Sequence, residues 1–375
     1  YLAAGATDVA VETGDTELLG ALGRQYAAME RSQQYLTGGL GARWEGESFG
    51  DAFELPTDRA YAETCASIGA IQWAWRLLLA TGEARYGDQI ERMLLNGFLS
   101  GLSLAGTEYF YVNPLQLRSD AEPDEGRSPA HGRRGWFDCA CCPPNIMRLL
   151  SSLASYVATR TDAGLQIHQY APATITSDGL SVRVETDYPY DGRVVVHVDE
   201  APDGPCEIAF RVPAWAHGAT LDGAAVEVGT YARTTRPLSP GATVELVLPM
   251  DPRLTVADEG IDAVRGCVAI ERGPLVYALE QADQDDGVLE DLRIDPTAPI
   301  TSEQRPDLLG GTTVLHAGGH LVAAPDRADA TTPYRTLGSA PSPTPATRPV
   351  GLTAIPYHLW ANRGPQAMRV WIPLA

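Results

Sequence analysis

The hydrophobic pattern changes its period near residue 160, and this change constrains the fold more than any other feature of the chain. Before it, apolar residues recur every three or four positions, as with Ile68, Ile71 and Trp75, which is typical of amphipathic helices. After it, segments such as SVRVETDY and TVELVLPM alternate apolar and polar residues or run through β-branched ones, as strands do. Helices followed by strands predict separate α and β domains instead of an alternating α/β sheet.

Two long loops interrupt the helical part. The pattern predicts helices over residues 1–14, 62–80, 84–100 and 143–160. The last helix would open with Pro143 and Pro144, and proline is well tolerated in a first helical turn. Between these helices lie two Gly- and Pro-rich stretches, 37–59 and 113–139, which are long for simple connections. Long ordered loops in compact domains often carry function, so we expect functional residues there.

Composition limits the partners of the chain. Its 375 residues suit two or three domains, and the absence of an apolar run of 18 residues argues against a membrane span. The formal net charge of −20 disfavours nucleic acid and anionic membrane surfaces, because phosphate binding requires clustered basic side chains. A neutral substrate such as a sugar fits this charge. No signal peptide pattern is visible, and the clustered cysteines favour a reducing compartment, so we expect a cytoplasmic protein.

The segment WFDCACCPPN, residues 136–145, is the strongest chemical signal. Adjacent thiolates of Cys141 and Cys142 could both reach one metal ion. Glu63 and Cys65 could complete the site, but residues at i and i+2 do not share a helical face. They converge only if their segment is a loop or strand that enters the following helix. Three sulfurs and one carboxylate favour zinc, although a structural zinc site, a redox sensor or a buried turn also fits the spacing.

The loop GGLGARWEGESFGDAFELP, residues 38–56, concentrates carboxylates: Glu45, Glu47, Asp51 and Glu54. Glycosidases pair a proton donor with a nucleophile across the bond that they cleave, and this loop could supply the donor. Solvated loop charge explains any single one of these residues equally well. His131, close to the cysteines, could line a pocket. Trp44 and Trp136 flank the two motifs, where they could bind sugar or belong to the core.

Several long segments together resemble a known family. They are LTGGLGARWEGESFG, LPTDRAYAETCASIGAIQWAWRLLLATG, WFDCACCPPNIMRLLSSLASY and RGCVAIERGPLVYALE. They resemble the β-L-arabinofuranosidases of glycoside hydrolase family 127 and, more loosely, family 146. The resemblance implies a multidomain α + β protein: the C-terminal portion of an (α/α)6 barrel over 1–160, then all-β sandwich domains over 161–255 and 256–375. It also implies that the N-terminal part of the catalytic domain is missing, with residue 1 in the middle of that barrel.

The resemblance further implies roles for individual residues. Zn²⁺ would be held by Glu63, Cys65, Cys141 and Cys142. Cys141 would be the nucleophile of a retaining hydrolysis and Glu47 the general acid/base, with Glu45 as a rival because the run ARWEGES departs from the usual family loop. Glu91 and Tyr111 would contact the sugar.

Other functions remain open on the sequence. A non-catalytic carbohydrate-binding protein with a structural zinc would bind sugar without hydrolysis, and a lyase or epimerase could use a similar barrel. A glycosidase for another furanose or an acidic sugar would stay within the resemblance. The partner expected in the hydrolase case is an oligosaccharide or glycoconjugate, and the C-terminal β domain could support a homodimer.

Overall fold

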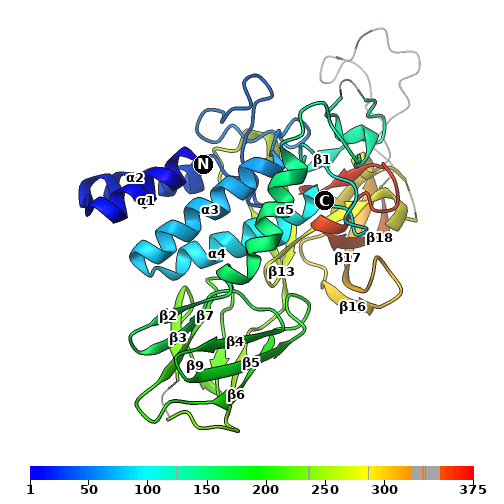
Figure 1. Ribbon diagram of the computed structural model, residues 1–375. Helices are drawn as coiled ribbons and strands as arrows, with labels where there is room; N and C mark the ends of the chain where they lie inside the picture. The colour runs from blue at the N-terminus through cyan, green and yellow to red at the C-terminus, as the bar shows by residue number, and fades with distance from the viewer. Residues whose placement is uncertain (124–125, 235–236, 286, 323–331, 333, 335–346) are drawn as a thin grey trace.

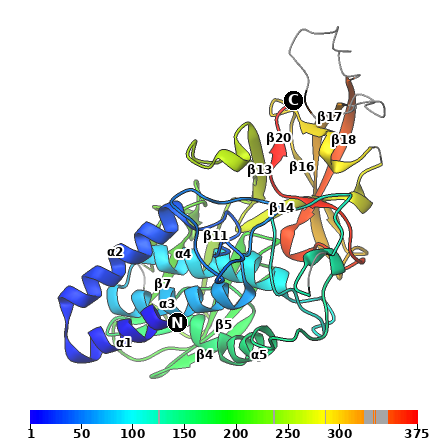
Figure 2. The same ribbon diagram turned by 90° about the horizontal axis from the view of Figure 1, so that it is seen from above.

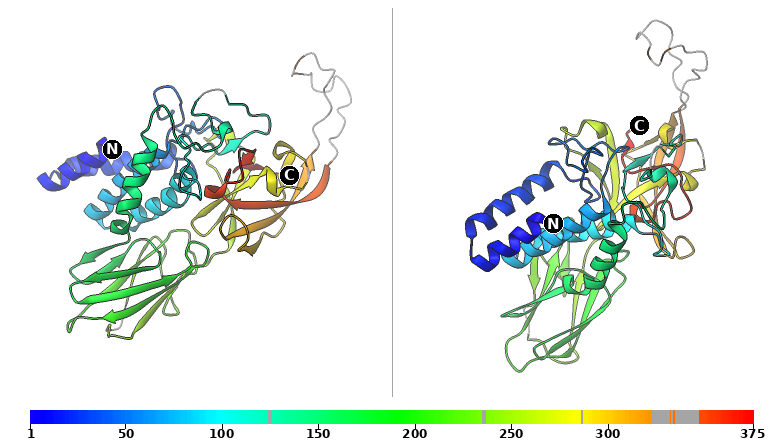
Figure 3. Two further views of the ribbon diagram at one scale, coloured as in Figure 1. Left: turned by 45° about the vertical axis from the view of Figure 1, so that its right-hand side comes forward. Right: turned by 45° about the horizontal axis from the view of Figure 1, so that its top comes forward.

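A computed structural model describes residues 1–123, 126–234, 237–285, 287–322, 332, 334 and 347–375. Helices occupy the first part of the chain and strands the rest, so the protein is a mixed α + β chain with several sheets. In Figures 1 and 3 a first group of strands lies below the helices α3 (Thr64–Thr81), α4 (Ala84–Arg92) and α5 (Cys142–Ser152), and a second group lies beside them. Within the described residues, no helix is both long enough and apolar enough to cross a membrane.

The main helices are α1 (Leu2–Thr13), α2 (Thr16–Ser32), α3 (Thr64–Thr81), α4 (Ala84–Arg92) and α5 (Cys142–Ser152). A π-helical turn, η1 (Met93–Phe98), and a 3₁₀ turn, η2 (Leu99–Gly101), continue α4. Further 3₁₀ turns are η3 (Pro129–His131), η4 (Leu153–Tyr156), η5 (Asp262–Val264), η6 (Gln281–Asp283), η7 (Leu289–Asp291) and η8 (Tyr357–Leu359). The helices predicted at 1–14, 62–80 and 84–100 are thus confirmed.

The helix expected over 143–160 ends earlier than predicted. Helix α5 stops at Ser152, and strand β2 (Ala158–Thr161) begins two residues before the expected end of the helix at residue 160. The segment contains Val157, Thr159 and Thr161, whose branched side chains favour strands. Residues 158–161 instead pair antiparallel with β3, which supplies their backbone hydrogen bonds.

Two sheets pack face to face after the helical part. One contains β2, β3 (Gly164–Ile167), β7 (Glu207–Val212) and β10 (Thr230–Arg233). The other contains β4 (Ala173–Ser177), β5 (Leu180–Thr186), β6 (Arg193–Glu200), β8 (Thr220–Leu221), β9 (Ala224–Ala225) and β11 (Thr243–Val247). The side chains of Val182, Val196 and Phe210 are buried in one core between them. Alternate residues of β5 are buried, as the period of two in the sequence predicts.

The remaining strands join into a single ten-stranded sheet, where the sequence led us to expect a sandwich. They are β1 (Gln116–Leu117), β12 (Pro252–Val256), β13 (Cys267–Arg272), β14 (Leu275–Glu280), β15 (Leu292–Ile294), β16 (Thr301–Arg305), β17 (Thr312–Val322), β18 (Thr347–Pro356), β19 (Met368–Arg369) and β20 (Ile372–Pro373). Strand β14 has buried side chains on both faces: Leu275, Tyr277 and Leu279 lie in one core, and Val276 and Ala278 in another. Both faces are therefore covered.

One face of this sheet supports the long loops of the helical part. Phe110 stacks on Trp360 with ring centroids 4.8 Å apart, and the Tyr357 hydroxyl donates to the Pro114 carbonyl at 2.9 Å. The buried Arg133 guanidinium donates to the carbonyl oxygens of Trp360 at 2.7 Å and Ser100 at 2.8 Å. Figure 2 shows α1 and α2 at the opposite end of the molecule from β17 and β18. The loops near the cysteines thus rest on the C-terminal sheet.

Candidate metal centre

Glu63 and Cys65 lie where an extended segment becomes helix α3. Glu63 is the residue before the helix, with φ −62° and ψ 137°, and Cys65 lies in its first turn. Thr64 fixes the segment in place: its backbone N–H donates to the Tyr111 carbonyl at 3.1 Å and its hydroxyl to the Phe110 carbonyl at 2.8 Å. The expected convergence through an extended segment is confirmed, because Glu63 does not adopt helical geometry.

Cys141 and Cys142 lie at the start of helix α5. Cys142 is its first residue, Cys141 immediately precedes it, and the two prolines occupy the first turn as predicted. Helices α3 and α5 pack against each other, so the N-termini of both meet at the four side chains. The positive end of a helix dipole favours anions, and it lowers the cost of holding thiolates and a carboxylate together.

The four side chains form a compact ligand set. One ligand atom from each of Glu63, Cys65, Cys141 and Cys142 lies within 4.8 Å of every other. The Cys65 and Cys142 sulfurs are 3.6 Å apart and those of Cys141 and Cys142 are 3.7 Å apart, too far for disulfides. Tetrahedral zinc with Zn–S bonds of about 2.3 Å separates its sulfurs by about 3.8 Å. The donor set and its spacing therefore fit one zinc ion.

The thiols resist joint ionisation. A hydrogen bond with Cys65 and burial raise the pKa of Cys142, while the same bond lowers the pKa of Cys65. Burial raises the pKa of Cys141 to about 12. Burial also raises the pKa of Glu63, and the negative charge of Glu47 adds to this effect. Four neighbouring acidic groups thus need a cation before all of them lose their protons.

The Tyr111 hydroxyl joins the ligand set to the acidic loop. It accepts a hydrogen bond from the Cys141 thiol at 3.2 Å and lies 3.6 Å from the Cys139 sulfur. It also lies 3.5 Å from Oε1 of Glu47. Tyr111 is buried, so this hydroxyl is held between the two groups. Glu47 and Cys141 therefore face the same small region.

Glu47 lies at the tip of a tight turn closed by the pairing of Arg43 with Ser48. Gly46 and Glu47 both have positive φ, of 70° and 51°. A left-handed conformation is unfavourable for glutamate, so the surrounding contacts must hold the turn. Oε1 of Glu47 accepts from the Tyr61 hydroxyl at 2.9 Å and from Nη1 of Arg127 at 2.6 Å. Partial burial raises the pKa of Glu47, but these hydrogen bonds lower it more and hold it below its usual range.

The other carboxylates of this loop have different surroundings. Glu45 is exposed, as Glu47 is, but its described hydrogen bond is made by its backbone carbonyl, which accepts from the Ser48 hydroxyl. Glu54 forms a short ion pair with Arg43, and Asp51 lies 3.1 Å from the same guanidinium. Asp51 and Glu54 thus stabilise the loop. Of the four carboxylates, Glu47 is the one with a described hydrogen bond to Tyr111, whose hydroxyl also contacts Cys141.

Glu91, for which the resemblance implies contact with the sugar, is not a member of the four-ligand set. It is 2% exposed, and its carboxylate accepts hydrogen bonds from Arg211, from Tyr188 and, at 3.2 Å, from the Trp215 indole. Arg211 on β7 also pairs with Asp88. These partners occupy the carboxylate where α4 packs on the first β-sandwich. We therefore do not include Glu91 in the candidate site, and its contact with the sugar stays a prediction.

A cavity of about 710 Å³ lies beside the cluster. His131 lines it, as predicted, together with Trp136 and Cys139, whereas Trp44 packs edge-on against Tyr61 at 5.3 Å. Sequence reasoning missed Arg127 and Tyr61. Arg127 belongs to the loop 113–139 that its length marked as functional, but no pattern indicated its contact with Glu47.

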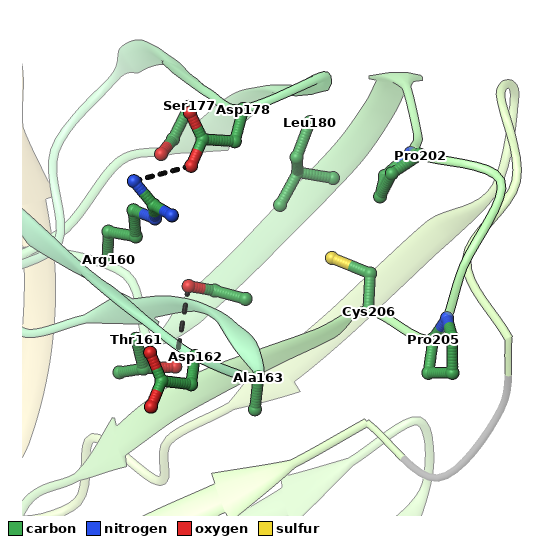
Figure 4. Close-up of a pocket in the computed structure, with 11 residues that line it drawn as sticks. Arg160, Thr161, Asp162, Ala163, Ser177, Asp178, Leu180, Pro202, Pro205 and Cys206 are labelled. Atoms are coloured by element: carbon green, nitrogen blue, oxygen red, sulfur yellow. Dashed lines mark hydrogen bonds and ion pairs between the residues drawn. The ribbon is translucent and has the colours of Figure 1, made fainter.

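A second cavity, of about 160 Å³, lies at one end of the first β-sandwich (Figure 4). Arg160 and Asp178 face each other across it and form an ion pair of 2.6 Å, which neutralises both charges. Cys206 also lines it, and burial raises the pKa of this thiol, so it is a poor nucleophile.

Comparisons with known proteins agree over the whole chain. The β-L-arabinofuranosidase GH127 catalytic domain matches residues 2–155, the GH127 middle domain residues 164–250, and the glycoside hydrolase family 127 C-terminal domain residues 252–373. The non-reducing end β-L-arabinofuranosidase of Bifidobacterium longum subsp. longum is 33% identical over 392 residues, covering 99% of this chain and 58% of that protein.

Solved structures give the same result. A GH127 β-L-arabinofuranosidase from Geobacillus stearothermophilus T6 is 36% identical with a TM-score of 0.89, covering all of this chain and 60% of its own. A GH127 β-arabinofuranosidase is 31% identical with a TM-score of 0.87, covering all of this chain and 59% of its own. The chain thus spans about three fifths of the length of these relatives.

Proposed function

The chain belongs to glycoside hydrolase family 127, and from this premise we propose that it acts as a retaining glycosidase that releases L-arabinofuranose from non-reducing β-linked ends. Relatives that match along the whole chain are β-L-arabinofuranosidases, which supports both the reaction and the sugar. The expected substrate is an oligosaccharide or a glycoconjugate.

The observation that carries the proposal is the position of Cys141. Its sulfur is one of four ligand atoms in a compact set, and it contacts the hydroxyl that also lies near Glu47. A nucleophile and a proton donor that share one neighbouring hydroxyl are close together. Such closeness favours retention, because retaining glycosidases separate the two groups by only about 5–5.5 Å.

In the first step, the Cys141 sulfur attacks the anomeric carbon while Glu47 gives its proton to the leaving oxygen. The carbon–oxygen bond breaks, a carbon–sulfur bond forms, and the aglycone leaves as an alcohol. In the second step, Glu47 removes a proton from water, whose oxygen attacks the anomeric carbon and displaces the sulfur. The sugar leaves with its original anomeric configuration because the carbon is inverted twice.

Zinc, held by Glu63, Cys65, Cys141 and Cys142, would keep the thiols ionised near neutral pH. The remaining work belongs to the side chains around it. Tyr111 orients the Cys141 sulfur through their hydrogen bond, and Tyr61 fixes the Glu47 carboxyl. The buried position of Cys142 and Cys65 keeps water from two of the sulfurs.

We further propose the finer organisation of the chain. Residues 1–160 would contribute the C-terminal portion of an (α/α)6 barrel, followed by β domains over 161–255 and 256–375. The close agreement with GH127 structures and the three adjoining domain matches support this division.

A panel of methyl, aryl and disaccharide glycosides tests the function. Hydrolysis of β-L-arabinofuranosides, with the β-anomer of arabinose as the first product by proton NMR, is the expected result. Release of the α-anomer first would overturn the retaining mechanism. Sugar binding without hydrolysis of any glycoside would overturn the enzymatic proposal and favour a carbohydrate-binding protein with a structural zinc.

A further inference from the structure

We propose that the cavity beside the cluster is the subsite for the leaving group, and that it binds a furanose or pyranose unit stacked on Trp136. The inference rests on the proposed function and extends it to the part of the substrate that departs. The cavity is lined by Gly126, Arg127, His131, Arg134, Trp136, Phe137, Asp138 and Cys139.

The cavity has the size of a saccharide site. Its volume of about 710 Å³ falls in the range of roughly 300–1,000 Å³ usual for small-molecule sites. None of the four ligands lines it, and neither does Glu47. It is therefore a neighbour of the place where the reacting sugar must sit and not that place itself.

Two lining residues connect the cavity to the reacting groups. Arg127 lies 2.6 Å from Glu47, and the Cys139 sulfur lies 3.6 Å from the Tyr111 hydroxyl that contacts Cys141. A proton donor in a glycosidase faces the oxygen of the departing group. Arg127 lines the cavity and contacts Glu47. The cavity therefore lies on the same side as Glu47, which is the side where the leaving group must be.

The exposed indole of Trp136 is suited to stack on a sugar ring. It is 64% exposed, whereas its neighbour Phe137 is 6% exposed and packs edge-on against Tyr111 with centroids 5.7 Å apart. The anchored phenylalanine holds the backbone next to the cluster, while the indole remains open to solvent. An exposed indole face offers a large apolar surface to the C–H groups of a sugar ring at little cost in side-chain entropy.

The other lining groups suit sugar hydroxyls. Arg134 donates to the Gly126 carbonyl at 2.9 Å, and this bond holds the guanidinium at the cavity. Arg134 and His131 offer donors, and Asp138 offers an acceptor, so hydroxyls of both kinds find partners. An apolar face with a few polar groups around it is the usual composition of a carbohydrate site.

Substrates that differ only in the leaving group test the subsite. A β-linked arabinofuranosyl disaccharide is compared with methyl β-L-arabinofuranoside, whose methyl group has no ring that could stack on Trp136. Trp136→Ala should lower kcat/KM for the disaccharide by roughly tenfold and leave the methyl glycoside unchanged. Trp136→Phe should restore most of the loss, since phenylalanine still stacks. Tyr334→Ala is the matched control, because Tyr334 is an 84% exposed aromatic outside the cavity.

An equal kcat/KM for the disaccharide in Trp136→Ala and the wild type would overturn the subsite. Cleavage of neither substrate by the wild type would instead contradict the proposed function. A binding measurement then decides the subsite by itself: the disaccharide should change the tryptophan fluorescence of the wild type and of Tyr334→Ala but not of Trp136→Ala. The same fluorescence change in all three proteins would reject the role of Trp136.

Discussion

Arg127 forms an ion pair with Glu47, with Nη1 lying 2.6 Å from Oε1, at the edge of the cysteine cluster. The guanidinium also lies over the Tyr111 ring, 4.3 Å from its centroid, and donates to the Tyr61 hydroxyl at 2.6 Å. This arrangement stabilises the ionised form of Glu47, whereas the first proposed step requires the protonated form. Arg127 must therefore move from Glu47, or yield to substrate, before the proton is delivered.

Replacing Arg127 should change the pH dependence of catalysis. The bonds from Arg127 and Tyr61 lower the pKa of Glu47 despite its partial burial, so removing the guanidinium should raise it. A general acid with a higher pKa stays protonated to higher pH, and the alkaline limb of kcat/KM should move upward in Arg127→Met. Arg127→Lys keeps the charge and should retain the limb of the wild type. An unmoved limb in Arg127→Met would show that Arg127 does not set this pKa.

Zinc binding should release protons. Because the pKa of Cys141 is raised to about 12 and that of Cys142 is also raised, both thiols are protonated near neutral pH without metal. Coordination by thiolates should then release at least about two protons per zinc bound at pH 7. Calorimetric titration of chelator-treated protein in buffers with different ionisation enthalpies measures this number. Binding of zinc without proton release would contradict thiolate coordination by these residues.

Substitutions within the CACC segment should separate ligands from a neighbour. Cys141→Ser removes the proposed nucleophile and a soft ligand, so it should abolish detectable turnover and weaken zinc binding by at least about tenfold. Cys139→Ser is the control, because Cys139 belongs to the same segment but not to the four-ligand set. It should keep about one zinc per chain. Equal zinc loss in both proteins, by elemental analysis, would indicate a different ligand set.

The role of Glu47 should depend on the leaving group. Glu47→Gln cannot donate a proton, so it should slow methyl or sugar glycosides by about 100- to 10,000-fold. Activated aryl glycosides, whose leaving groups need little protonation, should be slowed much less. Glu45→Gln tests the rival carboxylate two residues earlier and should behave as the wild type with both substrate classes. Equal slowing of both classes by Glu47→Gln would argue against an acid role.

Glu91 should matter for stability and not for the sugar. Arg211 is 0% exposed, so Glu91→Gln leaves part of its buried charge uncompensated, and we expect a loss of about 3 kcal/mol. Glu83→Gln is the control, since Glu83 forms an exposed pair with Arg85 and should cost less than about 1 kcal/mol. Thermal unfolding measures both, and KM should remain that of the wild type. A raised KM with unchanged stability would return Glu91 to the sugar site.

Local signals in the sequence predict the two helices whose N-termini carry the candidate metal ligands. Pro143 and Pro144 mark the start of α5, and the apolar period after Cys65 marks α3. Helix α2 has a comparable signal, since Leu22, Tyr26 and Met29 are buried at helical spacing.

Contacts between distant segments could not be predicted in this way. Arg127 and Glu47 lie 80 residues apart, and Arg211 and Glu91 lie 120 residues apart. Each pair joins different elements, and side-chain spacing along the chain contains no information about such contacts. The same reason applies to the ten-stranded sheet: β13 and β14 are neighbours in the sequence and pair as a hairpin, but the pairing of β14 with β18, which joins Tyr277 to Pro356, is decided by long-range packing.

Arg133 and the stacked pair of Phe110 and Trp360 have a consequence for protein engineering. The loop that leads to the cysteines is held by the carbonyl of Trp360, which lies near the end of the chain. The C-terminal segment that contains Trp360 therefore cannot be replaced without regard to these contacts. A chimaera that exchanges it for the corresponding segment of a relative must keep a backbone carbonyl within reach of Arg133 and an aromatic ring opposite Phe110.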